Sequence, residues 1–126
     1  MAYSAETHPL VLVVEDEALI RLNGVDILED AGYTVIEAAS ADEAIAILEQ
    51  APQVRLVFSD VDMPGTMNGL ELAELVHSRW PGIRLLLTSG HRQIRQADVP
   101  DDGRFVAKPY SSQTIVDHIH QLLDPR

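Results

Sequence analysis

The chain has 126 residues, of which 46% are apolar and 23% are charged, and its formal charge at pH 7 is −11. This length suits one compact domain, and so acidic a chain repels phosphate backbones and anionic lipids, so we expect no nucleic acid and no membrane as direct partners. The absence of cysteine excludes disulfides and cysteine-ligated metals, and the absence of a targeting signal or a long apolar run predicts a soluble, cytoplasmic protein.

Five short apolar runs alternate with segments of the length and periodicity of amphipathic helices. The apolar runs are Leu10–Val14, Thr34–Ala38, Val54–Ser59, Arg84–Thr88 and Arg104–Ala107. Helices are expected at about 17–31, 41–50, 69–79 and 112–123, with a short piece near 92–97. The alternation predicts one α/β domain over 10–123 with a parallel sheet, between a tail of residues 1–9 and a tail of residues 124–126.

The first expected helix carries two apolar stripes. Successive helical residues are about 100° apart, which places Ile20, Ile27 and Leu28 on the side that faces the sheet. The second stripe points to the other side, where a surface helix usually carries charge. We therefore predict an exposed docking stripe for a protein partner, made of Leu19, Leu22 and Val25.

Polar side chains follow four of the apolar runs at the point where each run ends. In an open parallel sheet these positions meet at one edge, where ligands bind. Carboxylates this close would repel one another without a cation, and their oxygens are the ligands that Mg²⁺ prefers. The sequence therefore predicts a magnesium site, with a hydroxyl and an ammonium beside it, from Glu15, Asp16, Asp60, Asp62, Thr88 and Lys108.

The same arrangement suits phosphoryl transfer, in which catalysis is mainly positioning and charge neutralisation. Asp60 would be the nucleophile, and its carboxylate is already ionised at pH 7, so no general base is needed. Mg²⁺ and Lys108 would each take up one phosphoryl oxygen, and Thr88 would form a hydrogen bond to the third.

Four motifs, each after its own apolar run, resemble the receiver domain of two-component response regulators. They are Val13-Val14-Glu15-Asp16, Phe58-Ser59-Asp60-Val61-Asp62-Met63-Pro64-Gly65, Leu87-Thr88-Ser89-Gly90 and Val106-Ala107-Lys108-Pro109. The resemblance covers about residues 10–123. It implies a (βα)₅ flavodoxin-like three-layer sandwich with sheet order 2-1-3-4-5.

The resemblance also implies a function. A stand-alone receiver accepts a phosphoryl group from the phosphohistidine of a histidine kinase or a histidine phosphotransfer protein, and then signals or relays through protein contacts. It catalyses only its own phosphorylation and dephosphorylation. The matching positions imply Asp60 as phosphoacceptor and metal ligand, Asp16 as direct metal ligand, Glu15 as an acidic ligand through water, the backbone carbonyl of Asp62 as a further ligand, Thr88 and Phe105 as switch residues, and Lys108 as the phosphate-binding lysine.

The sequence departs from the family pattern in several places. Glu15 stands where aspartate is commoner, and Phe105 lacks the hydroxyl of a tyrosine. The stretch 61–68 is one residue longer than usual and borders the site. The segment from Gly90 to Gly103 is a residue or two short, which predicts a brief or distorted fourth helix.

The sequence is also compatible with two other functions. The pair Asp60 and Asp62 after an apolar run also resembles the nucleophile and acid of haloacid-dehalogenase-type phosphotransferases, but Pro64 and the short chain count against that family. Turnover of small phosphomonoesters would distinguish it. The second alternative is a receiver-like docking module that is not phosphorylated, which a failure of labelling by acetyl phosphate would favour.

Overall fold

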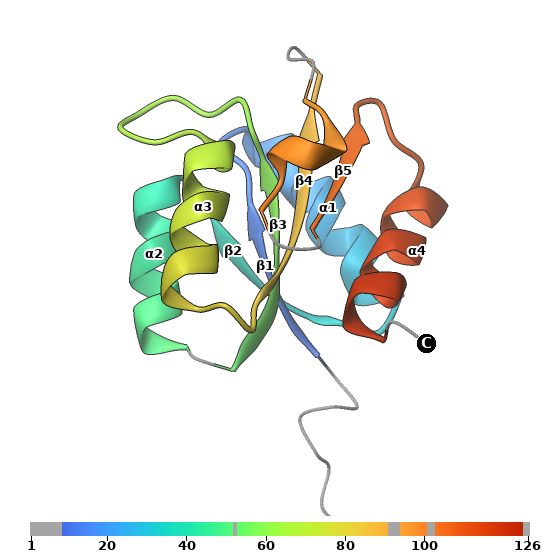
Figure 1. Ribbon diagram of the computed structural model, residues 1–126. Coiled ribbons are helices and arrows are strands. Elements are labelled where there is room, and N and C mark those ends of the chain that lie inside the picture. Colours follow the sequence, from blue (N-terminus) through green and yellow to red (C-terminus); the bar gives the residue numbers. More distant parts are fainter. Residues whose placement is uncertain (1–8, 52, 91–93, 101–102, 125–126) are drawn as a thin grey trace, which may run out of the picture.

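The computed structural model describes residues 9–51, 53–90, 94–100 and 103–124. Most of both predicted tails, and residues 92 and 93 of the expected short helix, lie outside the described residues. Five parallel strands form one sheet in the order β2-β1-β3-β4-β5 (Figure 1). They are β1 (Leu10–Val14), β2 (Thr34–Ala38), β3 (Val54–Asp60), β4 (Arg84–Ser89) and β5 (Arg104–Ala107). The predicted α/β class and strand order are confirmed.

The strands differ from the predicted runs only at two carboxyl ends. Both β3 and β4 continue one residue further than predicted, to Asp60 and to Ser89. The extension follows from register, because Asp60 pairs with Thr88 and Ser89 pairs with Ala107. Asp60 is therefore a residue of the central strand rather than of a loop.

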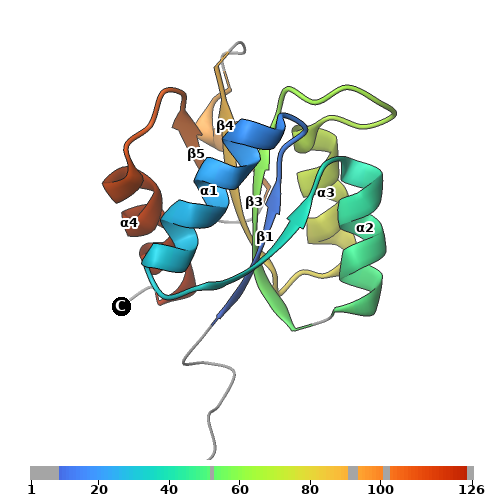
Figure 2. The same ribbon diagram turned by 180° about the vertical axis from the view of Figure 1, so that it is seen from behind.

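Within the described residues, four α-helices complete a three-layer sandwich: α1 (Ala18–Asp30), α2 (Ala41–Gln50), α3 (Gly69–Arg79) and α4 (Ser112–Leu123). Helices α2 and α3 cover one face of the sheet, and α1 and α4 cover the other (Figures 1 and 2). The short piece expected near 92–97 is instead a 3₁₀-helix, η2 (Gln96–Asp98), in the described part of the connection between β4 and β5. The fourth helix was expected to be brief or distorted, and the described part of this connection has three residues of 3₁₀-helix and no α-helix.

Side-chain caps explain where three of these helices begin. The oxygens of Ser40, Asn68 and Ser111 accept hydrogen bonds from backbone N–H groups of the first turns of α2, α3 and α4. Asn68 and Glu71 form a reciprocal capping box, with both bonds at 2.9 Å. These bonds satisfy N–H groups that a helix start leaves without partners, so the polar residue before each apolar stripe fixes where the helix starts.

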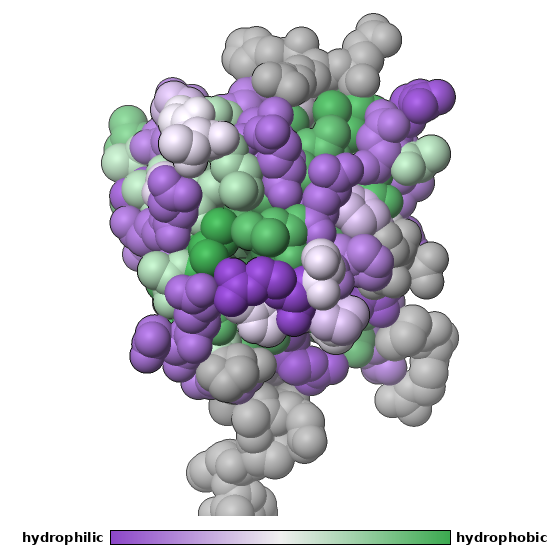
Figure 3. All heavy atoms as spheres, turned by 60° about the vertical axis from the view of Figure 1, so that its left-hand side comes forward, coloured by the Kyte–Doolittle hydropathy of each residue, from purple (hydrophilic) through white to green (hydrophobic). Residues whose placement is uncertain are grey.

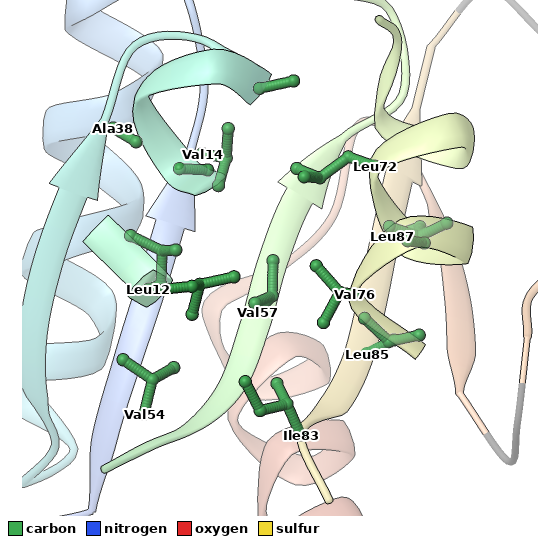
Figure 4. Close-up of a cluster of buried hydrophobic side chains, with 14 of the residues drawn as sticks. Leu12, Val14, Ala38, Val54, Val57, Leu72, Val76, Ile83, Leu85 and Leu87 are labelled. Carbon is green, nitrogen blue, oxygen red and sulfur yellow. The ribbon is translucent and has the colours of Figure 1, made fainter. Parts of the chain in front are cut away.

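Buried apolar side chains form one cluster on each face of the sheet. The cluster under α2 and α3 includes Leu12, Val57, Leu72, Val76 and Leu87, which interdigitate between strands and helices (Figure 4). The cluster under α1 and α4 includes Val11, Leu28, Phe58, Leu86, Ile115 and Ile119. On the side of α2 and α3, hydrophobic residues also reach the surface, including a patch near the middle of the view that hydrophilic residues border (Figure 3). Strands covered on both faces explain the nearly continuous apolar runs of the sequence.

The docking stripe predicted on α1 is wrong at one of its three positions. Leu19 and Leu22 are 82% and 52% exposed, whereas Val25 is only 6% exposed and belongs to the cluster under α1 and α4. Val25 and Leu28 are three residues apart, which places their side chains about 60° apart around the helix. Because Leu28 points into the core, Val25 lies at the margin of the buried face rather than on the solvent side.

Candidate functional site

The polar residues predicted to gather at the carboxyl edge of the sheet do lie together there. Glu15 and Asp16 directly follow β1, Asp60 and Thr88 lie at the ends of β3 and β4, and Lys108 follows β5. Glu15, Asp60 and Thr88 are buried, and Asp16 and Lys108 are partly buried. The strand order places β1, β3, β4 and β5 side by side, so residues far apart in the sequence share one small region (Figure 1).

Lys108 is the cationic centre of this group. Its Nζ lies 3.3 Å from Oε1 of Glu15 and 3.3 Å from Oδ2 of Asp60. Burial disfavours the charged ammonium, but the negative charges of Asp60 and Glu15 outweigh burial and raise the pKa of Lys108 above its ordinary value. Lys108 is therefore a permanent cation at neutral pH, held where it can meet a negatively charged group on Asp60.

Both carboxylate oxygens of Glu15 have polar partners. Its Oε2 accepts a hydrogen bond from the backbone N–H of Glu17 at 3.1 Å, while its Oε1 faces Lys108. Burial raises the pKa of Glu15, and the charge of Asp60 raises it further, against the opposing effects of the Glu17 N–H and Lys108. A carboxylate whose ionised form is disfavoured in this way would be stabilised by a bound cation.

Three carboxylates are close enough to share one metal ion. Ligand oxygens of Glu15, Asp16 and Asp60 all lie within 4.8 Å of one another. Hard oxygen donors from carboxylates suit Mg²⁺, which is commonly held by one or two carboxylates together with water. The donor set therefore fits a divalent cation, and three negative charges in this space give a physical reason for one to bind.

The backbone around Asp60 is fixed by close contacts. The N–H of Val61 donates to the carbonyl oxygen of Thr88 at 2.8 Å, and the N–H of Asp62 donates to Oδ1 of Asp60 at 3.3 Å. The first residue of α3, Gly69, packs directly on this turn, because a Cβ there would overlap the carbonyl oxygen of Asp60 and lie 2.8 Å from its carbonyl carbon. Glycine at 69 thus lets α3 begin against the end of β3.

Thr88 carries a hydroxyl that is buried without a partner. The residue is 3% exposed, and its Oγ1 has no hydrogen-bond partner among the described residues. An unsatisfied buried hydroxyl costs free energy, so such groups are rare in folded proteins. The same hydroxyl lines a small pocket that also contains Glu15, Asp60 and Tyr110, where it could donate to an oxygen placed on Asp60.

Two predicted site residues make contacts that the sequence did not indicate. The carboxylate of Asp62 accepts a hydrogen bond from the hydroxyl of Ser89, so the ends of β3 and β4 are tied together beside the site. Phe105 is partly buried and packs against the cluster under α2 and α3. The role of the Asp62 carbonyl as a metal ligand, and that of Phe105 as a switch residue, stay predictions.

Tyr110 is a residue of the site that the sequence analysis missed. Its ring contacts Phe58 edge-on, with the ring centroids 6.0 Å apart, and lines the pocket beside Asp60 and Thr88. It also lines a wider hollow of about 420 Å³ that includes Ile20, Asn23 and Lys108. The sequence did contain a signal, because Tyr110 follows Lys108-Pro109 just beyond the carboxyl end of a predicted strand. The peptide bond between Lys108 and Pro109 is cis.

Comparison with protein families gives a match over most of the chain. The model of the response regulator receiver domain matches residues 11–120. None of the helices in the described part of the chain has both the length and the apolarity needed to cross a bilayer.

Individual relatives point the same way. The chain is 37% identical over 118 residues to sensor kinase CckA of Brucella abortus, covering 90% of this chain and 12% of that protein, so it spans about an eighth of that relative. It is 28% identical to the response regulator receiver protein CpdR of Brucella abortus, covering 90% of this chain and 95% of that protein. The crystal structure of a response regulator receiver protein from Sinorhizobium medicae has a TM-score of 0.85 at 25% identity, covering 93% of this chain and 95% of that one.

Proposed function

The chain belongs to the response regulator receiver domain family, and on that premise we propose that it accepts a phosphoryl group on Asp60 from a phosphohistidine. The observation that carries the proposal is the position of Lys108, whose ammonium lies 3.3 Å from Oδ2 of Asp60 at the carboxyl edge of the sheet. Asp60 contacts an ammonium and shares a pocket with Thr88, whose buried hydroxyl has no partner among the described residues, and such an arrangement suits a group with several negative oxygens.

In the proposed reaction, an oxygen of Asp60 attacks phosphorus in line with the bond to the donor. The new bond from this oxygen to phosphorus forms as the bond from phosphorus to the imidazole nitrogen breaks, and that nitrogen keeps the electron pair. Lys108 neutralises one phosphoryl oxygen, and the hydroxyl of Thr88 donates to another. Asp60 needs no general base, because a carboxylate carries no proton to remove at neutral pH.

We assign a divalent cation, Mg²⁺, to the carboxylates of Glu15, Asp16 and Asp60, with the backbone carbonyl of Asp62 as a further ligand. Bound Mg²⁺ would neutralise the negative charge that the carboxylates and the phosphoryl oxygens bring to the same place. The support for this assignment is the spacing of the three ligand oxygens within 4.8 Å and the disfavoured ionisation of Glu15.

A histidine kinase or a histidine phosphotransfer protein is the proposed donor. The proposal draws on the match to the receiver domain family and on the likeness to sensor kinase CckA. A donor must reach Asp60 over the start of α1, where Leu19 and Leu22 are exposed beside the hollow lined by Lys108 and Tyr110. In this role the chain is a signalling module that reacts once per phosphoryl group, rather than an enzyme that turns over a substrate.

Labelling with acetyl phosphate tests the proposed chemistry directly. Intact-protein mass spectrometry should detect one added phosphoryl group in the presence of Mg²⁺ and none after chelation. Asp60→Asn keeps the shape of the side chain but removes the acceptor, so it should give no label. Asp30→Asn, which changes an exposed carboxyl group on α1, is the matched control and should be labelled like the native chain. Label on Asp60→Asn would reject the assignment, and no label on any variant would favour a docking module.

Donor docking is tested separately from the chemistry. Leu22→Asp should leave folding and labelling by acetyl phosphate unchanged but slow transfer from a phosphorylated partner at least about tenfold, a loss of about 1.4 kcal/mol. Leu19→Asp should act in the same direction, because its side chain lies on the same exposed part of α1. Unchanged transfer rates in both folded variants would remove α1 from the docking surface.

A further inference from the structure

The strand at one edge of the sheet is covered in an unusual way. β5 pairs with β4 on one side only, because it is the last strand in the sheet order. An edge strand leaves a row of backbone N–H and C=O groups without sheet partners. In the described part of the connection that leads to β5, the chain forms η2, the short orange helix of Figure 1, and not an α-helix.

One side chain takes the place of a neighbouring strand. The side-chain amide of Gln96 donates to the carbonyl oxygen of Gly103 and accepts from the N–H of Phe105 at 3.2 Å. A residue in a parallel strand makes this same pair of bonds, to the residues before and after its partner, which here would be Arg104. The primary amide of glutamine is chemically close to a peptide group, so it reproduces one rung of a sixth strand.

The segment that carries Gln96 is anchored at both ends. Before it, the N–H of Asp98 donates to the carbonyl oxygen of Arg95 at 2.9 Å and closes the 3₁₀ turn, and the N–H of Arg95 donates to Oδ2 of Asp98 at 3.0 Å. After it, Val99 is 4% exposed and is part of the cluster under α2 and α3. A Cβ at Gly103 would lie 2.6 Å from Cγ1 of Val99 and 2.9 Å from the carbonyl oxygen of Leu85. The close approach of these residues explains glycine at 103 and sets Gln96 against β5.

β5 leads directly to the site around Asp60, the proposed phosphoryl acceptor. Phe105 pairs with Leu87 on its inner side, and three residues further along the chain Lys108 reaches Asp60. The N–H of Lys108 donates to the carbonyl oxygen of Ser89 at 3.0 Å, so the end of β5 is fixed to β4. The four residues of β5 therefore pair with β4 along one edge, and among the described residues Gln96 bonds to the backbone of the other edge.

We propose that the side-chain amide of Gln96 is a clasp that closes the outer edge of β5, and that phosphoryl transfer to Asp60 opens it. The second half rests on the proposed function. A phosphoryl group adds negative charge beside Lys108, which at present divides its charge between Glu15 and Asp60. Drawing the ammonium toward the phosphoryl group shifts the end of β5, and the strain falls on the clasp, whose bond to Phe105 is exposed to solvent.

Amide hydrogen exchange at Phe105 measures the clasp without any phosphodonor. In Gln96→Ala the Phe105 N–H loses its acceptor, and its exchange should become at least about tenfold faster than in the native chain. Gln96→Glu keeps the acceptor but loses the donor to Gly103, so its exchange should be intermediate. Gln113→Ala is the matched control, because the side chain of Gln113 bonds to Asp117 on α4 and leaves β5 untouched. Protection of buried amides such as that of Leu86 verifies that each variant is folded.

The same measurement with acetyl phosphate and Mg²⁺ tests opening. In the native chain, the exchange rate of the Phe105 amide should rise after labelling. In Gln96→Ala, labelling should change that rate little. Equal protection of Phe105 in native chain and Gln96→Ala, without phosphodonor, would overturn the clasp. Labelled native chain with unchanged Phe105 exchange would overturn its opening. Absence of label, seen by mass in the same samples, would reject the proposed function and with it the opening step, while exchange without phosphodonor still decides the clasp.

Discussion

Asp60 lies at one edge of the sheet, here called the acceptor edge, where each polar side chain comes from a position at or near the end of a strand. The described part of the connection between β4 and β5 instead bonds to β5 through the side chain of Gln96, which lies within that connection. Asp60, Thr88 and Lys108 are brought together by parallel pairing of neighbouring strands. Gln96 instead bonds to backbone groups seven and nine residues away, across a turn that no strand register fixes. The two regions therefore differ in what positions them, the sheet in one and a local clasp in the other.

The regions also differ in how charge is balanced. At the acceptor edge the carboxylates of Glu15, Asp16 and Asp60 lie close together, and the one ammonium beside them contacts two of the three, so negative charge is in excess. In η2, Asp98 and Arg95 form an exposed pair of opposite charges with a distance of 3.3 Å. The excess of negative charge supports the proposed binding of a cation at the acceptor edge, whereas the charges of Arg95 and Asp98 balance each other.

The largest effect on labelling should come from removing the ammonium of Lys108 at the acceptor edge. Lys108 is the only lysine of the chain. Lys108→Ala should slow labelling by acetyl phosphate at least about a hundredfold, in line with the loss of one preorganised group that stabilises developing charge. Arg104→Ala removes a cation from the other end of β5, where it bonds to Gln121, and should leave labelling unchanged. Equal losses in the two variants would mean that net charge, and not position, matters.

The next largest effect should be on the free energy of unfolding, which alanine at a tightly packed glycine should lower more at the acceptor edge than beside η2. Gly69→Ala drives a methyl group into the backbone of Asp60 and should lower the free energy of unfolding by about 3 kcal/mol or more, and Gly103→Ala should lower it by about 1–3 kcal/mol. Chemical denaturation measures both. Gly24→Ala in α1 is the control, since its nearest neighbour would be 3.7 Å away, and it should be stable or slightly stabilised. A harmless Gly69→Ala would contradict the close contact between α3 and β3.

A smaller effect is expected from the unpartnered hydroxyl of Thr88. Thr88→Val keeps the shape but removes the buried polar group, so the free energy of unfolding should rise by about 1 kcal/mol. The variant should still be labelled by acetyl phosphate, but the faster exchange of the Phe105 amide after labelling should be lost. Thr34→Val, on exposed β2 surface, should change stability by less than about 0.5 kcal/mol. Lower stability of Thr88→Val would mean that the hydroxyl has a partner.

The smallest effect is a difference in titration. Burial raises the pKa of Glu15 above the ordinary 4.5, whereas the backbone N–H and side chain of Arg95 lower the pKa of Asp98 below 3.8. The stabilisation from Asp98 is thus present above pH 3.8 and is lost as the pH falls through its folded pKa. Glu15 has the opposite sign, because its folded pKa is raised, and the native state loses stability as the pH rises above 4.5.

Carboxyl-carbon chemical shifts, followed by NMR without Mg²⁺, resolve the two titrations. On acidification Glu15 should take up its proton before Asp98 does. Arg95→Ala should move the midpoint of Asp98 back toward its ordinary value and leave that of Glu15 alone. Glu15→Gln should flatten the decline of stability above pH 4.5. Coincident midpoints at ordinary values would remove the electrostatic difference between the regions.

Local patterns were enough to predict most of the elements. Strand and helix bounds agree with the apolar runs and periodic segments to within a residue, apart from η2. The reason is that caps such as Asn68 and turn residues such as Gly32, with its φ of 98°, act on their own neighbours in the chain. The error at Val25 has a different origin, because burial at the margin of a helix depends on which side chains pack beside it.

The sequence alone determined which residues meet at the carboxyl edge, because in a parallel sheet each apolar run delivers the residue that follows it to one side. Only the tertiary structure decided how they meet. It placed Lys108 between Glu15 and Asp60, left the Thr88 hydroxyl without a partner among the residues that the structure describes, and brought Tyr110 to the pocket wall. It also assigned the open edge of β5 to Gln96, because that pairing depends on distances across a turn that no periodicity in the sequence encodes.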